Sequence, residues 1–210
     1  AIMGYKASNQ AVFQVYKKEG GEQLFTKVND LNPSVHGTEN DWDVKIADFD
    51  LDGDNDILFN GNQNSWWYSN GGYIRNNFTS TGSFAFSLNY SGLRYEVSKL
   101  LNEEGPLAIL GLGVQNGGPA FGMHGGVNIA FEGGEPKLKD GAIAVGDYNN
   151  DGLNDILVTG RDAVNTPQAI LYYQTRNVAP AGEVIFSKVP NSEVAGLYHA
   201  TAQWGDYDVD

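Results

Sequence analysis

The sequence predicts an all-β chain, and three observations support that fold class. Aromatic residues make up 12% of the 210 residues, and 27 glycines stand against only 7 prolines. This composition suits short strands joined by tight turns better than it suits a helical bundle. Short apolar runs alternate with turn-rich stretches, and one acidic pattern is written twice along the chain. The hydrophobic content of 41% is enough for a buried core.

The expected strands recur in the same order around each acidic stretch. Residues 11–28 (AVFQVYKKEGGEQLFTKV) match residues 169–189 (AILYYQTRNVAPAGEVIFSKV), and both segments lead through a turn-rich stretch into an acidic loop. Only Leu93–Glu104 has a helix-like spacing of apolar residues, and this segment can equally be two short strands. We expect strands at 25–28, 44–47, 57–59, 142–145, 155–159, 169–173 and 186–189.

The acidic pattern has the spacing of a calcium site. Residues 48–56 read Asp-Phe-Asp-Leu-Asp-Gly-Asp-Asn-Asp, and residues 147–155 read Asp-Tyr-Asn-Asn-Asp-Gly-Leu-Asn-Asp. Oxygen-bearing side chains at alternate positions repel one another unless a hard cation collects them, and Ca²⁺ takes about six to eight oxygens. The spacing therefore predicts Ca²⁺ as the cofactor. Solvated turns are the plainer alternative, because Asp, Asn and Gly favour turns in any protein.

Each predicted ligand has a role that follows from its position in the loop. The seventh residue, Asp54 or Leu153, gives its backbone carbonyl, so any side chain is allowed there, and the ninth residue gives a bidentate carboxylate. Gly53 and Gly152 permit the sharp bend that turns the later ligands back toward the ion. The predicted ligands are Asp48, Asp50, Asp52, Asp54 and Asp56 in the first loop and Asp147, Asn149, Asp151, Leu153 and Asp155 in the second. An incomplete third loop begins at Asp206, Asp208 and Asp210.

The loops differ from an EF-hand, because the bidentate acid comes at the ninth position and no amphipathic helices flank the loop. The strings ADFDLDGDNDILFNG, VGDYNNDGLNDILVTG and WGDYDVD instead resemble the FG-GAP or VCBS repeat, the blade unit of integrin α-chain propellers and of many bacterial surface proteins. The resemblance covers most of the chain, is strong at the two full loops and is weak over residues 70–135. It implies a β-propeller built from four-stranded blades.

A decayed copy of the loop lies between the two full ones. Residues 100–113 (LLNEEGPLAILGLG) align with the first loop when Gly105 takes the place of Gly53, and Leu100 and Ala108 then replace the first and last ligands. We expect no calcium there. The copies divide the chain into about four repeats, at residues 1–56, 57–108, 109–155 and 156–210. We expect a part of a larger propeller, with a closed ring of four blades as the competing interpretation.

Other candidate residues are better explained by packing. Trp66, Trp67 and Tyr68 could stack on a sugar, but alignment with residues 171–173 makes them a second blade strand with core contacts. Trp42 and Trp204 are expected to pack between blades. The three histidines, His36, His124 and His199, lie in no catalytic motif and are expected at the surface. The sequence identifies no catalytic residue.

Charge and composition exclude several partners. The formal net charge is −13, which argues against nucleic acid, because nucleic-acid binding needs clustered Lys and Arg. The chain has no cysteine, so disulfides and thiolate metal sites are excluded. No apolar run approaches the roughly 18 residues that would span a bilayer. If the protein is secreted, its signal lies upstream of this stretch.

Together these features favour a calcium-stabilised recognition module of a secreted, cell-surface or periplasmic protein, with adhesion as the leading role and an unidentified protein or carbohydrate as its ligand. An enzymatic alternative is the propeller portion of a polysaccharide lyase that acts on acidic glycans. A third possibility is a structural spacer. A lyase would need basic residues converging in a groove with a Tyr, His or Lys base, so the convergence of basic and aromatic side chains on one face distinguishes these hypotheses.

Overall fold

The computed structural model describes residues 2–5, 11–18, 25–31, 43–47, 56–62, 69–74, 81–84, 91–100, 107–125, 128–175 and 183–205. Every regular element in these ranges is a β-strand, so the predicted all-β class is confirmed. None of the described residues forms a helix long and apolar enough to cross a membrane. The chain divides into two compact units, Ala1–Asn89 and Tyr90–Asp210.

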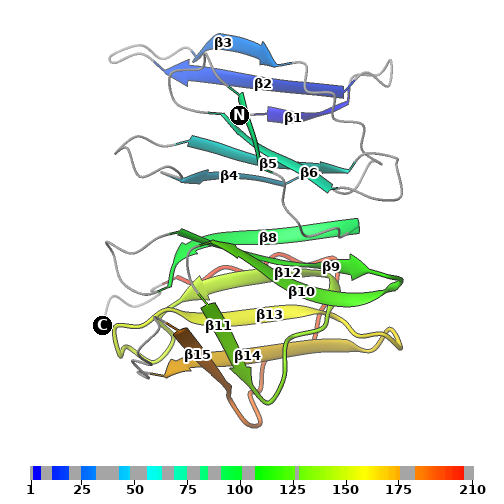
Figure 1. Ribbon diagram of the computed structural model, residues 1–210, viewed down its shortest axis with the longest axis vertical. Coiled ribbons are helices and arrows are strands. Elements are labelled where there is room, and N and C mark those ends of the chain that lie inside the picture. Colours follow the sequence, from blue (N-terminus) through cyan, green and yellow to red (C-terminus); the bar gives the residue numbers. More distant parts are fainter. Residues whose placement is uncertain are drawn as a thin grey trace. The chain divides into compact units, whose positions relative to one another are not determined.

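The first unit contains two antiparallel sheets, each formed by strands that follow one another along the chain (Figure 1). The first sheet has the order β1-β2-β3 and the second the order β4-β5-β6-β7. The strands are β1 (Ile2–Tyr5), β2 (Ala11–Lys18), β3 (Phe25–Leu31), β4 (Asp43–Ala47), β5 (Asp56–Asn62), β6 (Ser69–Ile74) and β7 (Thr81–Phe84).

The second unit contains one three-stranded and one five-stranded sheet, in the orders β10-β9-β8 and β11-β15-β14-β13-β12. All pairs are antiparallel except β11 with β15, which is parallel. The strands are β8 (Ser91–Lys99), β9 (Leu107–Gln115), β10 (Gly118–Gly125), β11 (Asn128–Glu132), β12 (Lys139–Gly146), β13 (Asp155–Arg161), β14 (Pro167–Thr175) and β15 (Glu183–Lys188).

Six of the seven strands expected by residue number lie entirely on described strands, and the seventh, 186–189, extends one residue beyond the end of β15. The helix-like segment is a strand where it is described, because β8 runs to Lys99 and residue 100 bends the chain. Residues 66–68 lie outside the described residues, and the second strand after the first acidic loop is β6, which begins at Ser69. In the sheet registers Ile74 pairs with Ile57, and Tyr172 pairs with Ile156, the equivalent residue of β13. The residue of the first hairpin that corresponds to Tyr172 is therefore Ile74, and not one of residues 66–68 as the sequence alignment predicts.

One core joins the two sheets of the second unit. Strand β12 lies against β8 and β9 (Figure 1), and both sheets contribute apolar side chains to a single buried cluster. Three aromatic rings pack on Phe131 of β11 at centroid separations of 5.0 to 5.5 Å. The buried cluster consists of Leu100, Ala108, Leu110, Leu112, Phe121, Leu138, Ile143, Ile156, Val158, Tyr172, Val184 and Phe186.

Three sheets carry a loop of the predicted series at the same place, between an edge strand and the strand paired with it. In the β4–β5 pair Ala47 faces Asp56, and in the β12–β13 pair Gly146 faces Asp155. In the β8–β9 pair Ser98 faces Ala108, the residue aligned with those two aspartates. The strand that enters a loop therefore shares a sheet with the strand that leaves it, whereas the repeats expected from the sequence divide the chain at the loops.

Residues 200–205, just before the third acidic stretch, belong to no described strand but have the alternating exposure of one. Their exposure alternates strictly, with Ala200, Ala202 and Trp204 half-buried and the residues between them exposed. Trp204 lies directly beside Gly146, where an added Cβ would come within 2.7 Å of its ring. The predicted packing role of Trp204 fits this contact, and Trp42 lies outside the described residues.

Candidate metal centre

The second acidic loop connects β12 to β13 and is described in full. It begins after Gly146, and its last predicted ligand, Asp155, is the first residue of β13. The loop folds back on itself through two left-handed residues, Asn150 with φ of 57° and Gly152 with φ of 83°. Glycine adopts this conformation at little cost, and Asn is one of the few other residues that tolerate it.

The side-chain oxygens at the first and third positions of the loop converge on one N–H group. Asp147 Oδ1 and Asn149 Oδ1 each accept the Asp151 N–H at 3.1 Å. The other oxygen of Asp147 accepts the Gly152 N–H at 2.7 Å. These bonds turn both side chains toward the interior of the loop, as the alternate spacing predicts.

The fifth position continues the series. Asp151 Oδ1 accepts the Leu153 N–H at 2.8 Å, and its second oxygen accepts the Asn149 Nδ2 amide at 3.3 Å. Three successive oxygen-bearing side chains therefore bond to the loop's own backbone, in the short-range manner typical of Asp and Asn in turns. A carboxylate oxygen has room for more than one partner, so these bonds are compatible with metal coordination.

Asp155 closes the loop and is the most buried of the predicted ligands in the second loop, with no exposed surface. Its Oδ2 accepts the Tyr148 N–H at 2.9 Å, which ties the end of the loop to its beginning, and its Oδ1 accepts the Gln174 N–H at 2.7 Å. Burial raises the pKa of the Asp155 carboxyl above its ordinary value. The two backbone N–H groups oppose this shift, and the charges of Asp151 and Asp147 add to it.

Among the described residues both partners of the Asp155 carboxylate are backbone N–H groups, and no basic side chain pairs with it. A buried carboxylate without a counter-charge is costly, since burial disfavours its charged form. A cation in the loop would supply the missing charge and reverse the effect of burial on this group.

A contact outside the predicted ligand set attaches the loop to the neighbouring sheet. Asn154 Nδ2 donates a hydrogen bond of 2.7 Å to the backbone carbonyl of Lys99, at the end of β8. No pattern in the sequence indicates this residue, because the eighth position of the loop is not a predicted ligand position and its partner is 55 residues away.

The remaining predicted positions are described only in part. Residues 48–55 and 206–210 lie outside the described residues, which leaves only the backbone of Asp56, at the start of β5, from the first and third loops. In the decayed copy Leu100 and Ala108 both lie in the hydrophobic core. The positions aligned with the first and last predicted ligands thus serve packing in that hairpin.

The donors of the second loop fit calcium by their chemistry. Asp147, Asn149, Asp151 and Asp155 offer carboxylate and amide oxygens within nine residues, and hard oxygen ligands suit Ca²⁺ better than Zn²⁺. In the described part of the chain no three His, Cys, Asp or Glu side chains are drawn together closely enough to hold a metal ion as they stand. Coordination would therefore require the Asp147, Asp151 and Asp155 carboxylates to come closer together.

Comparison with known proteins adds no further assignment, because no protein family model, curated protein or solved structure matches this chain.

Proposed function

We propose that this chain is a calcium-stabilised β-propeller segment of a secreted or cell-surface protein, and that it serves as a recognition module for a protein or carbohydrate, with adhesion as its leading role. The observation that carries the proposal is Asp155, a buried carboxylate without a cationic partner at the end of a loop lined by oxygens. In this proposal Ca²⁺ is structural, since it would join the two ends of a hairpin loop.

The sheet registers support a propeller of repeated blades. Three sheets place a loop of the acidic series between an edge strand and its neighbour, and the equivalent residues Asp56, Ala108 and Asp155 each pair with a residue near the end of that edge strand. The alternating exposure of residues 200–205, just before Asp206, is what the first strand of a further blade would display. Consecutive antiparallel sheets with loops at a constant position are typical of propellers.

Calcium should raise the melting temperature of the full chain. Binding to the native state alone adds about 2.7 kcal/mol when the free ion is at 100 times its Kd. We expect a higher melting temperature in calcium than in chelator and an increment that Asp147→Ala reduces. Equal melting curves under both conditions would overturn the proposal of a calcium site.

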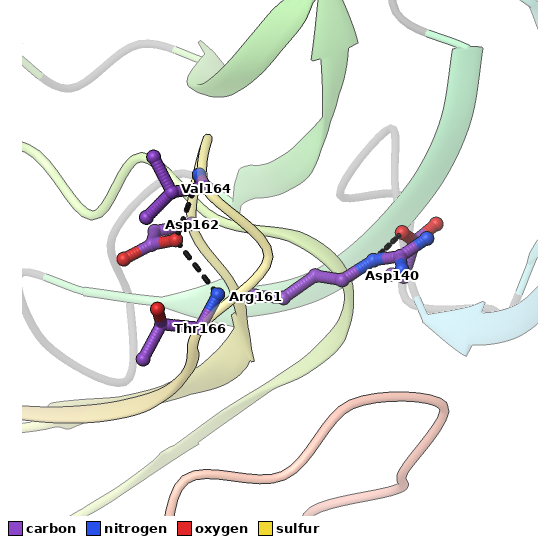
Figure 2. Close-up of polar contacts among 5 residues, drawn as sticks. All are labelled: Asp140, Arg161, Asp162, Val164 and Thr166. Carbon is purple, nitrogen blue, oxygen red and sulfur yellow. Dashed lines mark hydrogen bonds and ion pairs between the residues drawn. The ribbon is translucent and has the colours of Figure 1, made fainter.

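Asp162→Ala is the matched control for this experiment. Asp162 also accepts two backbone N–H groups within a hairpin loop, from Val164 and Thr166 at 2.9 Å (Figure 2), but it lies outside the acidic pattern. This variant should be less stable than the native chain in calcium and in chelator alike, with its calcium increment intact. A loss of the increment in both variants would point to general unfolding of the loops and not to a metal site.

The lyase alternative has less support from the described residues. A lyase that acts on uronates must neutralise the substrate carboxylate with basic groups, whereas the guanidinium of Arg161 is already paired with Asp140 at 2.6 Å. Degradation assays with uronate polymers test this alternative directly, and turnover would replace recognition by catalysis as the function.

A further inference from the structure

The second unit carries a cluster of polar and aromatic side chains on the other end of the β12–β13 pair from the metal loop. Arg161, the last residue of β13, pairs through Nε with Asp140 Oδ2 at 2.6 Å (Figure 2). The guanidinium carbon of Arg161 also lies 5.4 Å from the centre of the Tyr198 ring. The ring of His199 packs edge-on against Tyr198 at a centroid distance of 5.2 Å. We call Asp140, Arg161, Tyr198 and His199 the Arg161 cluster.

The backbone holds this cluster in an unusual conformation. Asp140 and His199 both have left-handed backbones, with φ of 53° and 51°, and the His199 N–H donates to the Asp140 carbonyl at 2.6 Å. Asp140 sits where the β12–β13 register is irregular, between Lys139 and Ala142. Left-handed backbone at non-glycine residues costs free energy and gathers at binding sites, where the surrounding structure maintains it.

The segment that carries Tyr198 is fastened to the sheet beneath it. Thr159 Oγ1 donates to the Leu197 carbonyl at 2.6 Å and accepts the Leu197 N–H at 3.0 Å. Gly196 approaches the backbone of Pro167 so closely that an added Cβ would come within 2.6 Å of it. Tyr198 nevertheless keeps 46% of its surface exposed. A large aromatic ring is thus held at the surface on a fixed support.

Only some of the polar side-chain atoms of the cluster form hydrogen bonds within the described part of the chain. Asp140 Oδ1 and the two Nη groups of Arg161 have no hydrogen-bond partner among the described residues, and neither does the Tyr198 hydroxyl. The surface therefore presents charge-assisted donors and an acceptor side by side, next to an exposed aromatic ring. The charges of Arg161 and Asp140 cancel, so the pair offers hydrogen bonds with little net charge.

We propose that the Arg161 cluster is a binding site for a neutral sugar residue of a glycan. A sugar hydroxyl both accepts and donates, so two adjacent hydroxyls can accept from the Arg161 guanidinium and donate to the Asp140 carboxylate at once. The C–H face of the sugar ring would lie on the exposed part of Tyr198. An acidic glycan fits less well, because Arg161 is already neutralised and the whole chain carries a formal charge of −13.

This assignment rests on the proposed recognition function and names the ligand and its site. Neutral oligosaccharides of glucose, mannose and galactose, with a galacturonate oligomer as the acidic counterpart, should be titrated into the full chain in calcium and followed by calorimetry. We expect at least one neutral oligosaccharide to bind, and we expect Tyr198→Ala and Arg161→Ala each to weaken that binding at least tenfold. Tyr198→Phe, which keeps the ring, should weaken it only a few-fold.

Val164→Ala is the control, because Val164 is 79% exposed on the neighbouring β13–β14 turn and outside the cluster. It should bind as the native chain does. Absence of neutral-sugar binding, binding of the acidic oligomer alone, or unchanged binding in Tyr198→Ala and Arg161→Ala would each overturn the assignment. The calcium increment in melting temperature is a separate readout, since Tyr198→Ala should retain it, so a failed sugar site and a failed calcium site are distinguishable.

Discussion

At the scale of single residues, burial decides what a carboxylate or a phenol does in this protein. Asp155 and Asp162 both accept two backbone N–H groups, yet Asp155 is fully buried and Asp162 is only half-buried. The pKa of Asp155 is raised because burial outweighs the two N–H bonds. Without a cation the charged form of Asp155 therefore opposes folding. The folded state favours the protonated carboxyl, and the stability that this proton contributes is lost as the pH rises through the raised pKa.

Tyr172 should make the protein sensitive to alkaline pH. Its hydroxyl is buried and donates to the Gly134 carbonyl at 2.8 Å, and burial, with a smaller effect from Glu135, raises its pKa from 10.0 to about 12. The folded state therefore holds this proton more tightly than the unfolded state does. The resulting stabilisation is complete below pH 10 and is lost as the pH rises from 10 toward about 12.

Tyr172→Phe tests this expectation through urea unfolding at pH 8 and again above pH 11. At pH 8 the variant should lose about 1 kcal/mol with the hydrogen bond to Gly134. Above pH 11 the gap between the variant and the native chain should shrink, because phenylalanine has no proton to lose. A gap that stays constant with pH would show that Tyr172 does not take part in alkaline unfolding.

At the scale of elements, local turn chemistry determines where strands reverse. Gln115 faces Gly118 across the β9–β10 hairpin, so Asn116 and Gly117 form a two-residue turn. Both have left-handed backbones, with φ of 52° and 80°. This is the type I′ geometry that an Asn-Gly pair favours, because its twist matches that of the flanking strands.

Gly117→Ala should destabilise the protein through backbone conformation alone. No atom lies within 4 Å of an added Cβ at Gly117, so only its positive φ opposes the change, at a cost of about 1 to 2 kcal/mol. Gly118→Ala is the matched control in the same turn, since its added Cβ would meet only the Gln115 carbonyl at 4.0 Å. Thermal unfolding of the two variants should differ, and equal losses would contradict the conformational explanation.

Strand pairing also accounts for the extended form of the described part of the segment with helix-like spacing, which ends β8. The apolar residues of Leu93–Glu104 can follow either period over so short a stretch, and pairing of β8 with β9 fixes the extended form. In the extended form β8 forms its backbone hydrogen bonds with β9, and its apolar side chains can reach the core that the two sheets share. Local sequence alone could not distinguish the two outcomes.

At the scale of the whole molecule, the proposed metal loops predict a stoichiometry. The two complete acidic patterns, residues 48–56 and 147–155, should bind two Ca²⁺ per chain, and the decayed hairpin, with Leu100 and Ala108 in the core, should bind none. Calorimetric titration of the native chain should give about two equivalents, and Asp147→Ala should give about one. One equivalent of Ca²⁺ bound by the native chain, or no decrease in Asp147→Ala, would contradict the prediction that both acidic loops bind Ca²⁺.

Much of the fold was predictable because it depends on neighbours along the chain. Short apolar runs such as Ile57–Phe59 and 155–159 stand next to Gly- and Asp-rich turns, and both lie on strands. The hydrogen bonds of the second loop are also local, since Asp and Asn in a turn bond to backbone groups within a few residues, while the predicted calcium ligation stays a prediction. Repeat boundaries were less predictable, because periodicity gives the length of a unit but not where its sheet begins.

The sequence by itself determined the all-β class, the strands and the local bonding of the acidic loop, because each of these depends on residues close together in the chain. Only the tertiary structure decided the parallel pairing of β11 with β15, the Asn154 bond to Lys99 and the meeting of Arg161 with Tyr198. Each of these contacts joins segments more than 30 residues apart. Such contacts form only when distant parts of the chain fold against one another, and neither partner signals its counterpart in the sequence around it.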